Sequence, residues 1–157
     1  MLLPLFQSLE DSAIGEAIRG SLWLFPVVEA FHLVGLAMIG GAILVVDFRL
    51  LGLGLRSHPV SRLARDTQPW VIGSLVLMIL SGFPLFLSEA IKCYYSFAFW
   101  TKMTSLLLAV MFTFTVRRYV AFAPDGRFSP ARHRAVAIAS LLLWSTVGWG
   151  GRWIGFS

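Results

Sequence analysis

The chain has 157 residues, of which 57% are hydrophobic and only 13% are charged. Soluble domains carry about twice this share of charged residues, so the composition argues against a soluble enzyme and predicts one integral membrane domain over residues 1–157. The net charge is +5, but the basic residues stand beside apolar runs. This arrangement excludes a nucleic-acid-binding surface and favours a multi-pass protein in the lipid bilayer of the bacterial inner membrane.

The first segment, residues 1–20, predicts a short amphipathic helix at the membrane interface. Its apolar residues recur at helical spacing. We do not expect a secretory signal peptide, because the acidic residues Glu10, Asp11 and Glu16 interrupt the segment before an apolar core can form.

Four apolar segments follow, each near the ~20 residues that cross a bilayer core. They predict an all-α fold, a transmembrane four-helix bundle. The expected bounds of the spans are 22–46, 70–88, 99–116 and 135–156. Pro69 suits the first helical position of the second span, and Gly82 with Pro84 predicts a kink near its end. Ser129 before Pro130 predicts the N-cap of the last helix.

The distribution of basic residues predicts the orientation of the chain. The connectors after the first and third spans hold nine Lys and Arg residues, and the opposite side holds four. Because basic loops stay in the cytoplasm, both termini should face outward, which is an N-out, C-out topology. Small residues four apart, Ala37 with Gly41 and Ser105 with Ala109 and Thr113, predict faces where helices pack closely.

Several polar residues fall within the outer half of the predicted bundle. Glu29 and His32 lie three apart in the first span, on one face. Such groups cost roughly 2.5–3.5 kcal/mol each at membrane depth, so a role is expected for them. Lys102 and Arg152 lie at the matching depth of the third and fourth spans, and the Trp149 ring lies nearby. The five residues form a candidate binding site.

Two interpretations of this cluster stay open at the level of sequence. In the first, Glu29 forms a structural ion pair with Arg152 or Lys102, His32 is a hydrogen-bonded core residue and Trp149 only packs. In the second, the cluster binds haem b, with His32 as an axial ligand to the metal, or a quinone. The other two histidines do not lie level with His32, so a bis-histidine haem within one chain is not expected.

The remaining charged residues predict structural roles. Asp47 and Arg49 should form an ion pair at the cytoplasmic end of the first span, and Arg117 with Arg118 should serve as orientation charges. The single cysteine, Cys93, excludes an internal disulfide and has no predicted role. No motif for nucleophilic or acid–base catalysis is present, so the chain should have no catalytic activity of its own.

A resemblance adds to these inferences. Pro26, His32 and Gly35 open a pattern that continues through Asp47 and closes with the run GRWIGF at the end of the chain. In this pattern the sequence resembles an uncharacterised family of small bacterial four-helix integral membrane proteins. It is more loosely similar to copper-resistance D-type proteins and small b-type cytochrome subunits. Those place further histidines within the membrane, and this chain does not.

The function expected is that of a non-catalytic membrane subunit or binding protein. Its site around His32 would serve a membrane electron-transfer system through haem or quinone. One alternative is a structural accessory subunit that packs against a larger membrane complex. Another is a small transporter, which would need a homo-oligomer because four short spans enclose no pore.

Overall fold

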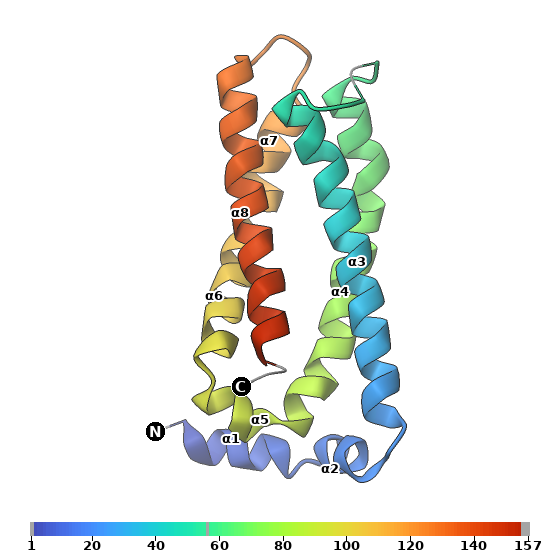
Figure 1. Ribbon diagram of the computed structural model, residues 1–157, viewed down its shortest axis with the longest axis vertical. Coiled ribbons are helices and arrows are strands. Elements are labelled where there is room, and N and C mark those ends of the chain that lie inside the picture. The colour runs from blue at the N-terminus through green and yellow to red at the C-terminus, as the bar shows by residue number, and fades with distance from the viewer. Residues whose placement is uncertain (1, 56, 155–157) are drawn as a thin grey trace.

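The computed structural model describes residues 2–55 and 57–154, and every regular element in that part of the chain is helical. The elements are α1 (Leu3–Glu10), α2 (Ala13–Gly20), α3 (Leu24–Leu51), α4 (Val60–Ser88), α5 (Ala90–Tyr95), α6 (Phe97–Phe112), the π-helical turn η1 (Thr113–Arg117), α7 (Arg118–Ala121) and α8 (Pro130–Ile154). The long helices α3, α4, α6 and α8 run alongside one another, and α1 and α2 lie across one end (Figure 1).

Three helical stretches are long and apolar enough to cross a membrane: Leu24–Leu51, Val60–Ser88 and Phe97–Ala121. They contain the second and third predicted spans and all but the first two residues of the first. Helix α8 has 25 residues but is not among them, since its second half holds glycine, tryptophan, serine and threonine among the aliphatic residues. Residues 155 and 156 of the predicted fourth span lie outside the described residues.

Helix α4 begins ten residues before the predicted second span. Pro69 was expected at the first helical position, but it lies inside the helix. The early turns are held by packing, because Val60 and Ala64 are buried in a core cluster with Val46 of α3. The carbonyl that loses its partner to Pro69 belongs to Arg65, an exposed residue where water can replace the missing N–H.

The N-terminal segment forms two helices where one was predicted. The side chain of Ser12 accepts a hydrogen bond from the backbone N–H of Gly15 at 3.3 Å, so Ser12 is the N-cap of a new helix, α2. The predicted N-cap of α8 is confirmed, because the Ser129 hydroxyl oxygen accepts from the N–H of Arg132 at 3.3 Å.

Both short helices are docked onto the ends of the long ones. The Glu10 carboxylate accepts from the N–H of Ile91 at 2.6 Å and pairs with Arg19 at 3.1 Å. The buried ring of Phe6 contacts Phe86 edge-on, with ring centroids 5.6 Å apart. These contacts tie α1 and α2 to α4 and α5, so the segment covers one end of the long helices.

Gly15 sets how closely α2 approaches α4. A Cβ at this position would lie 2.5 Å from the carbonyl oxygen of Glu10 and 2.8 Å from that of Leu87. Gly15→Ala should therefore push α2 away and lower the free energy of unfolding by about 1–3 kcal/mol. Gly20→Ala is the control, because a Cβ there meets nothing within 4 Å.

Alkylation of Cys93 reports on this docking, because α1 packs against α5, which carries Cys93. Burial, with the Glu89 carboxylate nearby, raises the pKa of the Cys93 thiol to about 11. The thiol is protonated at pH 8 and should react slowly. Gly15→Ala should accelerate the reaction by opening this end of the molecule. Equal rates in the Gly15→Ala and Gly20→Ala variants would contradict the close approach.

The long helices pack mainly as α3 with α4, α6 with α8, and α3 with α8, whereas α4 and α6 hardly touch. The predicted packing face of α6 is confirmed at Ala109 and Thr113, which are buried. The predicted face at Ala37 and Gly41 is wrong for packing within the chain. Both residues are exposed, and α3 buries Ile39, Ala42 and Ile43 instead.

Candidate functional site

A cavity of about 290 Å³ lies between the long helices at the end covered by α1 and α2. Four of the five predicted site residues line it together: Glu29, His32, Lys102 and Arg152. They come from three helices, α3, α6 and α8. The sequence-based depth argument therefore placed these four side chains at one level, as the structure does.

His32 is held in one tautomer by α4. Its Nδ1 lies 2.9 Å from the hydroxyl oxygen of Ser81, and that hydroxyl donates its only hydrogen to the carbonyl oxygen of Leu77 at 2.6 Å. Ser81 can therefore only accept from His32, so Nδ1 carries a hydrogen. In the neutral ring Nε2 then presents a lone pair, and the imidazole also lies close enough to the backbone of Met78 to interact with it.

Gly82 gives His32 its place against α4. A Cβ at Gly82 would lie 3.0 Å from Cε1 and 3.4 Å from Nδ1 of the imidazole. A side chain there would push the ring into the cavity and separate it from Ser81. Gly82 was predicted to mark a kink, whereas its contact with His32 makes it part of the site.

Lys102 reaches the cavity across two glycines of α8. A Cβ at Gly150 would lie 3.0 Å from the Cβ of Lys102, and one at Gly151 would lie 3.5 Å from its Nζ. Among the described residues, the partly buried Lys102 ammonium has no hydrogen bond or ion pair. A positive charge on a helix apolar enough to cross a membrane is costly unless it is paired, so this group is available to a ligand or to water.

Glu29 does not form the structural ion pair that the sequence suggested. No ion pair within the described part of the chain involves it, and the side chain is exposed at the margin of the cavity. Glu29 and Lys102 form no ion pair in the part of the chain that the structure describes.

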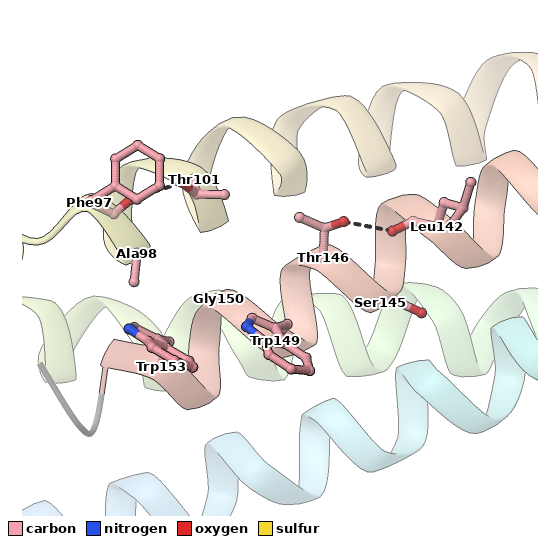
Figure 2. Close-up of a pocket in the computed structure, with 9 residues that line it drawn as sticks. All are labelled: Phe97, Ala98, Thr101, Leu142, Ser145, Thr146, Trp149, Gly150 and Trp153. Atoms are coloured by element: carbon pink, nitrogen blue, oxygen red, sulfur yellow. Dashed lines mark hydrogen bonds between the residues drawn. The ribbon is translucent and has the colours of Figure 1, made fainter.

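Trp149 does not line the cavity. It is 71% exposed and stacks on Trp153 with ring centroids 6.2 Å apart. Figure 2 shows both rings on α8, beside a separate groove of about 460 Å³ that Phe97 and Thr101 of α6 also line. Helical spacing put Trp149 at the right depth, but its side chain lies on the exposed side of α8.

The described residues offer no cluster of three or more His, Cys, Asp or Glu side chains that could hold a metal ion. His32 is therefore a single imidazole beside a cation and a carboxylate. An arrangement of this kind can donate hydrogen bonds to the oxygens of a small polar group and accept hydrogen bonds from its hydroxyls.

A second polar centre lies farther along the long helices, toward the end opposite α1 and α2. Asp47 is fully buried, and its Oδ1 accepts from Nε of Arg117 at 2.8 Å. The predicted pair of Asp47 with Arg49 is wrong, because residues two apart on a helix point to different faces. Nε of Arg49 instead donates to the carbonyl oxygen of His58 at 2.8 Å.

Arg117 is likewise not an ordinary orientation charge. It is buried, lies at the end of the π-helical turn η1 and also donates to the carbonyl oxygen of Ile43 at 3.2 Å. Among the described residues, the other Asp47 oxygen, Oδ2, and the buried hydroxyl of Ser140 have no hydrogen-bond partner of normal geometry, although the two groups lie close enough to interact. The pair thus joins α3, η1 and α8.

Residues 11–157 match the model of a family of unknown function, DUF6644. The chain belongs to this family. The match spans the cavity and the buried ion pair of the DUF6644 chain and leaves α1 outside. No curated protein and no solved structure matches it, and no relation to copper-resistance D-type proteins or b-type cytochrome subunits is shown.

Sequence reasoning missed the residues that support the site in this DUF6644 protein. Ser81 and Gly82 come from the second span, which has no charged residue and gave no signal of a site. Gly150 and Gly151 appeared only as a glycine run. The missed signal is that small residues on one helix stand level with a large polar side chain on its neighbour.

Proposed function

We propose that this protein is a non-catalytic membrane subunit or binding protein whose cavity around His32 holds a quinone for a membrane electron-transfer system. The observation that carries the proposal is the meeting of His32 and Lys102 in one cavity, where the Lys102 ammonium has no hydrogen bond or ion pair to the residues that the structure describes. The cavity is at the low end of the volume range of small-molecule sites, roughly 300–1,000 Å³.

The chemistry of the two side chains suits the two redox states of a quinone. The lone pair on Nε2 of His32 accepts a hydrogen bond from a quinol hydroxyl, and the Lys102 ammonium donates to a carbonyl oxygen. Phe86 and Phe99 stack with ring centroids 5.5 Å apart and line the same cavity. Their faces supply the apolar surface that a quinone ring needs.

The proposal also includes the placement of the chain in the bacterial inner membrane. Helix α8 would be a fourth span, because it packs along both α3 and α6. The count of basic residues puts both termini outside, and the cavity, at the same end as α1 and the last turn of α8 (Figure 1), would then lie in the outer half.

The test is the composition of the protein purified in mild detergent. We expect about one quinone per chain in the organic extract and no Soret band. A Soret band that disappears in His32→Ala would show that the ligand is haem and not quinone. A histidine that binds haem iron through Nε2 usually carries its hydrogen on Nδ1, as proposed for His32. Preparations with neither group, and no saturable binding of added quinone, would overturn the proposal.

One observation favours a second candidate, a structural accessory subunit. Ala37 and Gly41 are exposed, and a Cβ at Gly41 would meet nothing within 4 Å. An exposed pair of small residues four apart lets another helix approach closely, from a second copy or a larger complex. Loss of co-purifying subunits in Gly41→Leu, with His32→Ala tolerated, would support this role over ligand binding.

A further inference from the structure

A second cavity, of about 360 Å³, opens between α4 and α6 next to the first. We call it the lateral groove. The two cavities have in common these residues: His32, Met78, Gly82, Phe86, Phe99 and Lys102. The two polar groups of the proposed site therefore stand where the cavity and the lateral groove adjoin.

The other walls of the lateral groove are apolar. Besides the common residues it is lined by Leu75, Ile79, Phe83, Met103 and Leu106. Ile79 is 58% exposed and Met103 is 43% exposed, so these side chains form an open rim. Since α4 and α6 hardly touch and both belong to stretches apolar enough to cross a membrane, the rim faces the bilayer interior.

We propose that the ligand is an amphiphile with a long apolar tail, which enters sideways from the bilayer and leaves its tail in the lateral groove. This inference rests on the proposed quinone function and specifies the ligand as a quinone with an isoprenoid or alkyl chain. The polar ring lies between His32 and Lys102, and the chain runs out between Ile79 and Met103. The end covered by α1 and α2 then needs no opening.

A tail gains little free energy on passing from lipid to an apolar groove, so binding affinity would not reveal where the tail lies. The test is therefore the position of the tail. A quinone with a photoreactive diazirine in its alkyl chain should label Ile79, Phe83 or Met103. Excess unlabelled quinone should prevent the labelling. Met103→Trp should reduce it at least tenfold by filling the rim. The control Leu107→Trp changes an exposed neighbour that lines neither the cavity nor the lateral groove, and it should leave the labelling unchanged.

The outcomes separate the two proposals. If excess unlabelled quinone does not reduce the labelling of any residue, the quinone function itself fails. If competition is seen but the label lies in the groove of Trp149 and Trp153, or is spread over lipid-facing residues such as Leu107, the quinone function stands and the lateral groove is wrong. If the label lies on α1 or α2, entry is from the covered end.

Discussion

Asp47→Leu is expected to lower the free energy of unfolding by about 3–5 kcal/mol, because it leaves the buried Arg117 guanidinium without its carboxylate. The double variant Asp47→Leu/Arg117→Met should recover most of this loss, since it removes both charges and replaces them with apolar volume. Unfolding of the detergent-solubilised protein by heat or denaturant measures both effects.

Arg118→Met is the control for this comparison. Arg118 follows Arg117 directly but is exposed, with its guanidinium over the Phe122 ring at 5.3 Å. Its replacement should change stability by no more than about 0.5 kcal/mol. A double variant as unstable as Asp47→Leu alone would show that the two residues do more than neutralise each other.

Lys102→Met is expected to weaken quinone binding about 10- to 100-fold and to leave the stability of the protein unchanged or slightly higher. The binding loss corresponds to one hydrogen bond from a charged group, roughly 1.5–3 kcal/mol. Stability should not fall, because the Lys102 ammonium has no partner among the described residues and methionine keeps the length of the side chain.

The matched variant is Lys92→Met. Lys92 lies on α5, pairs with Glu89 at 3.7 Å and does not line the cavity. Quinone titration monitored by tryptophan fluorescence should show wild-type affinity for this variant. If Lys102→Met keeps full affinity, or loses stability to the same degree as affinity, then Lys102 has a structural role and the assignment of the site is wrong.

Part of this fold and of its candidate site could be predicted from the sequence. Hydropathy and the three-residue spacing of Glu29 and His32 were sufficient to predict the first three spans and the level at which four polar side chains meet. Depth alone cannot give rotation about a helix axis, which is why Trp149 was placed in the cavity although it faces outward.

The partner of Asp47 was beyond sequence reasoning for a different reason. Arg49 is two residues away and carries the right charge, whereas Arg117 is 70 residues away. Arg117 reaches Asp47 from a π-helical turn, which no pattern of apolar residues predicts. The break between α1 and α2 was more accessible, because Ser12 is a residue type that favours the N-cap position.

The π-helical turn at Thr113–Arg117 also bears on how this protein can change in evolution. Each hydrogen bond in a π turn closes one residue later than in an α-helix, so the turn accommodates an inserted residue without disturbing the helix on either side. An insertion or deletion at this point would move Arg117 relative to Asp47 while the face that α6 turns toward α8, including Ala109, kept its register. The buried charge can thus be gained or lost separately from the cavity that Lys102 lines at the other end of α6.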